Sequence, residues 1–74
     1  MRYHANLIGS KIGRLRYARS WTQDTLAAKL QILGCDVSRD VIANIENRRS
    51  VATDKQCFFM AKVFSVSIDE LFQP

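Results

Sequence analysis

The chain has 74 residues, a formal net charge of +4 and two cysteines, and these numbers exclude several classes of protein. Domains usually contain roughly 50 to 250 residues, so one domain is expected, with little room for a deep catalytic cleft. The apolar share of 47% favours a folded chain over a disordered one. No apolar run approaches the roughly 18 residues that a membrane-spanning helix needs.

Motifs for catalysis or metal binding are missing from the sequence. Cys35 and Cys57 match no four-ligand zinc spacing, and His4 adds no usable ligand, so we expect no metal and no cofactor. The start shows no secretory signal, which predicts reduced thiols in a cytoplasmic protein. Cys35 is interpreted as a passive small residue rather than a redox handle, and Cys57 as a core thiol. No pairing of nucleophile and base appears, so we expect no enzyme.

Apolar spacing predicts an all-α fold of five short helices. The first covers about residues 6–19, where Leu7, Ile8, Ile12 and Leu15 form a stripe. Arg2 and His4, before it, are expected to form a disordered arm. The second helix covers about 23–33, with Thr22 as its N-cap and Gly34 as its stop.

The remaining three helices also follow hydroxyl caps. Ser38 begins the third, Thr53 begins the fourth, which ends near Phe64, and Ser67 begins the fifth over residues 68–72. Apolar positions along the whole chain predict the core. The predicted core residues are Ile12, Leu15, Leu26, Leu30, Val37, Ile42, Ile45, Phe58, Met60, Ala61 and Phe64. The outward face of the third helix holds small and hydrogen-bonding side chains, namely Arg39, Asp40, Ala43, Asn44 and Asn47.

Charge is distributed unevenly along the chain. Nine basic and four acidic residues lie at or before Arg49, a net charge of +5, whereas the remainder has two lysines and three acids, a net charge of −1. This asymmetry indicates an anionic partner on one side of the molecule.

Four segments in order resemble the Cro/repressor family of helix-turn-helix proteins, also called XRE-like. They are Leu15-Arg16, Trp21-Thr22-Gln23 with Leu26-Ala27, Val37-Ser38 with Ile42 and Ile45-Glu46-Asn47, and Val66-Ser67-Ile68-Asp69-Glu70-Leu71-Phe72. The similarity covers about residues 7–72. It implies a compact five-helix, lambda-repressor-like DNA-binding domain whose second and third helices form the helix-turn-helix. Residues 1–74 would then be one such domain, with an ordered core of about 6–72.

The sequence departs from the family pattern at two places. Ser20 occupies a position where the family usually has glycine, and Trp21 replaces leucine. About five additional residues separate the second and third helices. We expect a longer second helix followed by a loop at Gly34-Cys35-Asp36.

The resemblance also implies roles for individual residues. The third helix would enter the major groove of DNA, with Arg39, Asp40, Ala43 and Asn44 at the base edges. Arg16 and Glu46 would form an internal ion pair rather than contact DNA. Phosphate contacts would come from polar and basic side chains around these helices, namely Thr22, Gln23, Ser38, Asn47, Arg48, Arg49, Arg14 and Arg19.

Two functions follow as hypotheses. The first is a sequence-specific regulator of transcription, a repressor, that binds double-stranded DNA. The alternative is an antitoxin or another protein-interaction module on the same scaffold, with a regulatory protein as its partner. An exposed apolar patch of Phe59, Leu71 and Phe72 is expected to form a homodimer interface.

Overall fold

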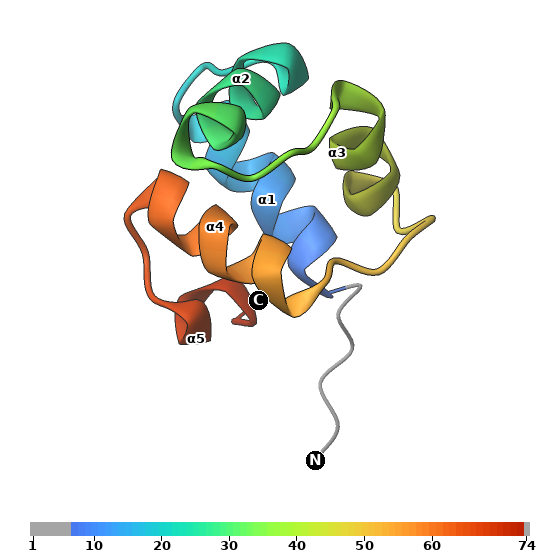
Figure 1. The fold of residues 1–74 in the computed structure, drawn as a ribbon. Coiled ribbons are helices and arrows are strands. Elements are labelled where there is room, and N and C mark those ends of the chain that lie inside the picture. The colour runs from blue at the N-terminus through green and yellow to red at the C-terminus, as the bar shows by residue number, and fades with distance from the viewer. Residues whose placement is uncertain (1–6, 74) are drawn as a thin grey trace.

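The computed structural model describes residues 7–73, which form five helices and no strand. The helices are α1 (Leu7–Ala18), α2 (Gln23–Leu33), α3 (Arg39–Glu46), α4 (Asp54–Phe64) and α5 (Ile68–Leu71) (Figure 1). The all-α class and the five predicted helices are thereby confirmed. Asn6, the predicted first residue of α1, lies outside the described residues, as do Arg2 and His4 of the predicted arm.

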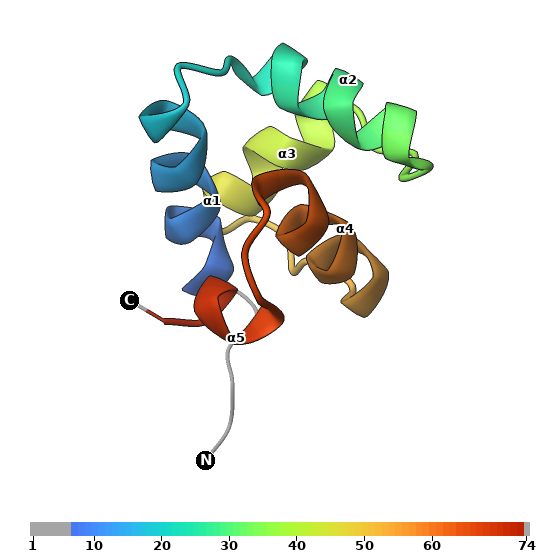
Figure 2. The same cartoon turned by 90° about the vertical axis from the view of Figure 1, so that its left-hand side faces the viewer.

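The helices surround one core. α1 contacts α3 and α5, while α2 contacts α3 and α4. Figure 2 shows α2 lying across one end of the molecule above α3 and α4, with α5 at the opposite end near the start of α1. This arrangement leaves the outer side of α3 without a covering helix.

Side-chain caps fix where four of the helices begin. The hydroxyl groups of Thr22, Ser38, Thr53 and Ser67 each accept a hydrogen bond from the backbone N–H three residues further on. The Gln56 side chain also accepts from the Thr53 N–H at 2.9 Å, which completes a capping box. Each such cap typically contributes about 1 kcal/mol to stability. The sequence predicted all four starts.

The predicted core is confirmed at most positions, but Phe58 was placed wrongly. Phe58 is 51% exposed, whereas Phe64 is fully buried. The buried positions of α4 are 57, 60, 61 and 64, which places residue 58 on the solvent side of the helix. Leu15 lies half-buried against the core.

The apolar patch predicted from the sequence also needs correction. Leu71 is fully buried rather than exposed, and its helix α5 packs against α1 and α4. Phe59 and Phe72 are half-buried and pack against the core cluster. A helix of four residues shows no full apolar period, so its sequence could not indicate which side chain points inward.

Gly9 allows α1 and α3 to approach closely. A Cβ atom at this position would collide with the backbone carbonyl oxygen of Ile45. At Gly13 a Cβ would lie 3.6 Å from Oε1 of Glu46, an ordinary contact distance. Only the first of these glycines is therefore required by packing.

The connection from α2 to α3 has the form predicted from the sequence. Gly34 adopts a left-handed conformation with φ of 101° and ends α2. The loop then buries Cys35 and Val37, and the Gln31 side chain donates to the Val37 carbonyl oxygen at 2.8 Å. The additional residues thus lengthen α2 and return the chain to the core before α3 begins.

Candidate nucleic-acid interface

The outward face of α3 carries the residues that the sequence predicted for base contacts. Arg39, Asp40 and Asn44 are exposed, and Ala43 is half-buried. The opposite face buries Ile42 and Ile45 in the core. Because the core fixes the rotation of the helix about its axis, these polar side chains are held toward solvent.

The N-terminus of α2 lies beside the start of α3. The two side chains Asp24 and Arg39 approach to 3.9 Å between Oδ1 and Nε, a weak pair because both are largely exposed. A groove of about 650 Å³ joins the end of α1 to these two helix starts, and its lining includes Tyr17, Thr22, Gln23 and Arg39. The structure therefore brings Arg39, a predicted base-reading residue, to one surface with Thr22 and Gln23, two predicted phosphate-binding residues.

Tyr17 is a member of this surface that the sequence analysis missed. Its side chain is 75% exposed and borders the groove, and the Arg16 guanidinium lies 4.6 Å from its ring centroid. A tyrosine on a largely apolar helix is usually interpreted as core. Tyr17 follows Arg14 by three residues, and residues three apart share a helix face. This spacing could have indicated that Tyr17 is exposed beside Arg14.

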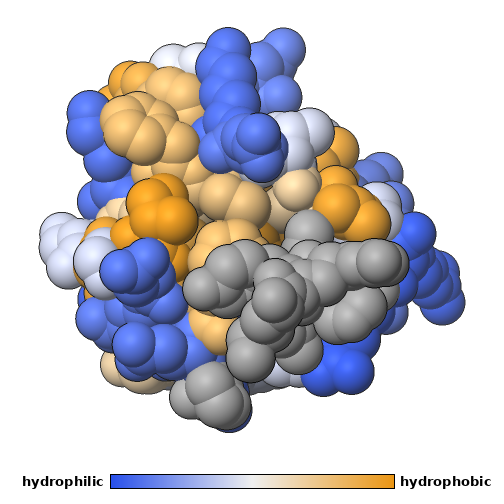
Figure 3. All heavy atoms as spheres, turned by 90° about the horizontal axis from the view of Figure 1, so that it is seen from below, coloured by the Kyte–Doolittle hydropathy of each residue, from blue (hydrophilic) through white to orange (hydrophobic). Residues whose placement is uncertain are grey.

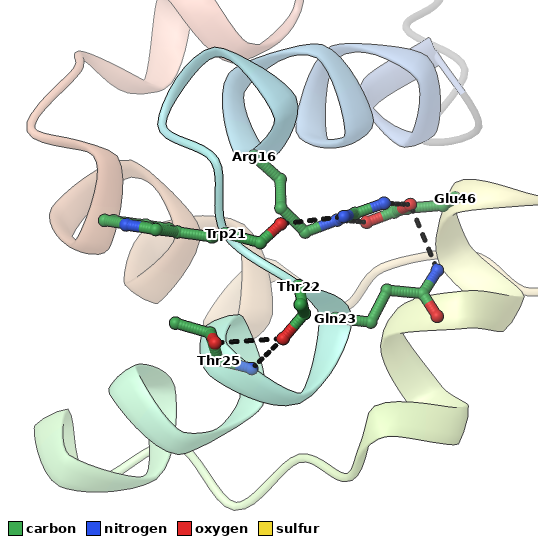
Figure 4. Close-up of polar contacts among 6 residues, drawn as sticks. All are labelled: Arg16, Trp21, Thr22, Gln23, Thr25 and Glu46. Atoms are coloured by element: carbon green, nitrogen blue, oxygen red, sulfur yellow. Dashed lines mark hydrogen bonds and ion pairs between the residues drawn. The ribbon is translucent and has the colours of Figure 1, made fainter.

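Glu46 connects the three helices behind the groove. Its Oε2 accepts from Nε of Arg16 and its Oε1 from Nη2 of Arg16, each at 2.8 Å. Oε1 also accepts from Nε2 of Gln23 at 3.2 Å, as Figure 4 shows. The hydrogen bond to Glu46 raises the pKa of Arg16, so the guanidinium stays charged. The predicted ion pair is therefore present, and it also holds Gln23 of α2 against α3.

Arg16 has a further bond that fixes the turn before α2. Its Nη1 donates to the Trp21 carbonyl oxygen at 2.9 Å (Figure 4). Thr22 follows directly, and its Oγ1 accepts from the Thr25 N–H at 3.0 Å. The side chain of one buried arginine thus positions the start of α2, where phosphate binding was predicted.

The segment after α3 places two basic side chains at the surface. Arg48 has φ of 62°, a left-handed conformation, and its Nη2 donates to Oγ of Ser10 at 2.7 Å. Arg49 is exposed, and its backbone N–H donates to the Asn44 carbonyl oxygen at 2.8 Å. Asn47 is the exposed C-cap residue of α3. These three residues follow the base-reading face directly.

Two other predicted phosphate residues differ in their surroundings. Ser38 is exposed, and its Oγ is the N-cap acceptor of α3. Arg19 is half-buried, and its guanidinium donates to the carbonyl oxygens of Leu15 at 3.2 Å and Phe64 at 2.7 Å. Arg19 therefore joins the end of α1 to the end of α4, and it is not part of the proposed interface.

The described residues offer no alternative site of a metal or membrane type. Within residues 7–73 there is no group of three or more histidine, cysteine or acidic side chains that could hold a metal ion. None of the described helices has the length and apolarity required to cross a membrane. Cys35 and Cys57 are buried, and burial raises the pKa of both thiols, so they are poor nucleophiles near neutral pH.

Five helices, with an outward polar face on the third and a capped second helix beside it, define a helix-turn-helix domain. A family model described as helix-turn-helix matches residues 12–71. The chain therefore belongs to the Cro/XRE-like helix-turn-helix family, a family of DNA-binding transcription regulators. No curated protein and no solved structure matches the chain.

Proposed function

We propose that the protein binds specific sequences in double-stranded DNA and represses transcription, with α3 in the major groove. The observation that carries the proposal is the exposed face of α3, where Arg39 and Asn44 stand on a helix whose other face is fixed in the core. An arginine suits guanine O6 and N7, and an asparagine suits adenine N6 and N7. Asp40 has the acceptor chemistry for cytosine N4.

Phosphate contacts on both sides of α3 would set its position in the groove. On one side lie Thr22 and Gln23 at the α2 N-terminus, where backbone N–H groups favour an anion. On the other side lie Asn47, Arg48 and Arg49. Arg14 and Tyr17 extend this surface along α1. Such contacts orient the protein without reading sequence, whereas the α3 side chains supply the specificity.

A homodimer is part of the proposal. Figure 3 shows apolar side chains gathered on one face of the molecule, over α4 and α5. Phe58 and Ile68 of these helices are 51% and 41% exposed, and Phe59 and Phe72 are half-buried. The surface of Phe58, Phe59, Ile68 and Phe72 takes the place of the patch of Phe59, Leu71 and Phe72 that the sequence predicted. It belongs to the part of the chain whose net charge is −1, which favours a protein partner over DNA there.

Salt dependence of duplex binding tests the DNA-binding role. Arg14, Arg48 and Arg49 are three cationic phosphate contacts, so the logarithm of affinity should fall with the logarithm of salt concentration with a slope of about −3 per subunit. Fluorescence anisotropy with a labelled duplex measures this slope. An affinity that does not change with salt, or no duplex binding, would favour the protein-interaction alternative and contradict the proposal.

Sedimentation tests the homodimer separately. We expect self-association in the micromolar range. The Phe58→Ser variant should weaken it and keep the fold, because the Phe58 side chain is exposed. A monomer at high micromolar concentration would contradict the dimer while leaving DNA binding open to its own test.

The proposed location of the protein is the cytoplasm, where a regulator of this kind meets its DNA.

A further inference from the structure

A second groove lies away from the outward face of α3. It runs between the C-terminal part of α2 and that of α4, has a volume of about 360 Å³, and is lined by Trp21, Lys29, Ile32, Leu33, Lys62 and Val63. Ile32 is 84% exposed and Leu33 is 42% exposed. Exposing two neighbouring large aliphatic side chains in water is unfavourable unless a partner covers them.

The apolar wall of this groove is held in place before any partner binds. Ile32 and Leu33 belong to the last turn of α2. Gly34 ends this turn, and Gln31 ties it to the loop through its bond to Val37. Figure 2 shows this end of α2 above α4. A partner would therefore meet an ordered surface, which lowers the entropic cost of binding.

The groove is basic on both walls. Lys29 lies on α2 and Lys62 on α4, and no acidic residue is among the lining residues. Within residues 7–73 neither lysine forms a salt bridge. Their ammonium groups instead lie over aromatic rings, 4.7 Å from the Trp21 centroid and 5.4 Å from the Phe58 centroid. Two cations beside an apolar floor complement a ligand that carries carboxylates on either side of an apolar side chain.

We propose that this groove binds an acidic amphipathic segment of a partner protein. An apolar side chain of that segment would lie on Ile32, Leu33 and Val63, and its carboxylates would pair with Lys29 and Lys62. The phosphate backbone of DNA would use the lysines but would leave Ile32 and Leu33 uncovered. The groove is separate from the outward face of α3, and the proposal does not depend on DNA binding.

Trp21 supplies the measurement, because it lines the groove and is the only tryptophan of the chain. It also lines the groove beside Tyr17, so the variants of Ile32 and Lys62 assign the signal to the second groove. The probe is a short helical peptide with leucines on one face and glutamates beside them, and its control is the same peptide with glutamines in place of the glutamates. We expect the glutamate peptide to change Trp21 fluorescence saturably. The glutamine peptide should bind at least about tenfold more weakly.

Exposed side chains allow variants that should keep the fold. Ile32→Ser and Lys62→Glu should each weaken binding of the glutamate peptide about tenfold. The matched control is Val51→Ser, because Val51 is 61% exposed and lies outside the groove. This variant should bind the peptide as the wild type does. Unchanged circular dichroism spectra would establish that each variant is folded.

Four outcomes would overturn the proposal. The first is no fluorescence change up to about 1 mM glutamate peptide, which corresponds to only about 4 kcal/mol of binding free energy. The second is equal binding of the glutamine peptide. The third is competition between duplex DNA and the peptide, together with weaker DNA binding by the Lys62→Glu variant. That result would make Lys62 a phosphate contact. The fourth is self-association that Ile32→Ser abolishes and Phe58→Ser does not, which would assign the groove to a second copy of this chain.

Discussion

Arg16 and Glu46 are joined by two hydrogen bonds of 2.8 Å, from Nε to Oε2 and from Nη2 to Oε1, so a residue of α1 holds the end of α3. Both side chains are largely shielded from water, with exposed fractions of 8% and 10%. The same carboxylate holds Gln23, and the same guanidinium holds the Trp21 carbonyl oxygen. This pair therefore adds polar links between α1, α2 and α3 to the core packing that places these helices.

Breaking the pair should destabilise the protein strongly. In the Glu46→Gln variant the buried guanidinium loses its counter-charge, which typically costs about 3–5 kcal/mol. Urea denaturation should show this loss in the free energy of unfolding. The matched control is the double variant Arg16→Met with Glu46→Leu, which removes both charges and should recover most of the stability. A Glu46→Gln variant as stable as the wild type would show that the pair is not structural.

The two glycines of α1 should respond in opposite directions to alanine. Gly9→Ala places a methyl group against the Ile45 carbonyl oxygen and should lower the free energy of unfolding by about 1–3 kcal/mol. Gly13→Ala meets only an ordinary contact, and its higher helix propensity should raise stability by up to about 1 kcal/mol. Thermal or urea unfolding of the two variants checks the contrast. A similar change in both would contradict the close approach of α1 and α3.

Ser20 has a backbone conformation that favours glycine. Its φ is 58°, in the left-handed region, at the position where the family pattern has glycine. Ser20→Gly should therefore raise the free energy of unfolding by about 0.5–1 kcal/mol, since relief of strain exceeds the added entropy of the unfolded chain. Ser50→Gly is the control at an exposed serine that is not in that region. Stabilisation by Ser50→Gly as large as by Ser20→Gly would count against this explanation.

The buried thiols should make the protein less stable in alkaline solution. Desolvation raises the pKa of Cys35 and Cys57 in the folded state. The folded protein then keeps its thiol protons at a pH where the unfolded chain releases them, so the free energy of unfolding falls as the pH rises above about 8.5. Unfolding measured at several pH values should show this fall, with a smaller fall in Cys57→Ala. Equal pH dependence in the variant and the wild type would contradict burial of Cys57 as a cause.

The sequence was sufficient to predict the helices because caps and apolar periods are local signals. Thr22, Ser38 and Gly34 each act within a few residues of their own position, and the structure has the predicted boundaries there. Phe58 and Leu71 were misplaced because burial at the edge of a helix face, or within a single turn, depends on which partner helix covers it. The packing of one helix on another cannot be inferred from the residues of a single helix.

The candidate site was predictable to a similar extent. The outward face of α3 follows from its own apolar period, and the Arg16–Glu46 pair follows from the family resemblance. The groove beside Tyr17 and the bonding of Arg19 to Phe64 could not be predicted, because both depend on how distant helices pack.

Selection of bound sequences from random DNA duplexes tests the central claim most directly, namely that α3 reads bases. The wild type should enrich a two-fold symmetric site with half-sites about one helical turn apart. Arg39→Ala should lose about 1–3 kcal/mol of discrimination at one base pair of each half-site. Lys62→Ala, which removes a charge on α4 away from this face, should enrich the wild-type site. If no sequence is enriched, or if Arg39→Ala enriches the wild-type site unchanged, α3 does not read the bases through Arg39.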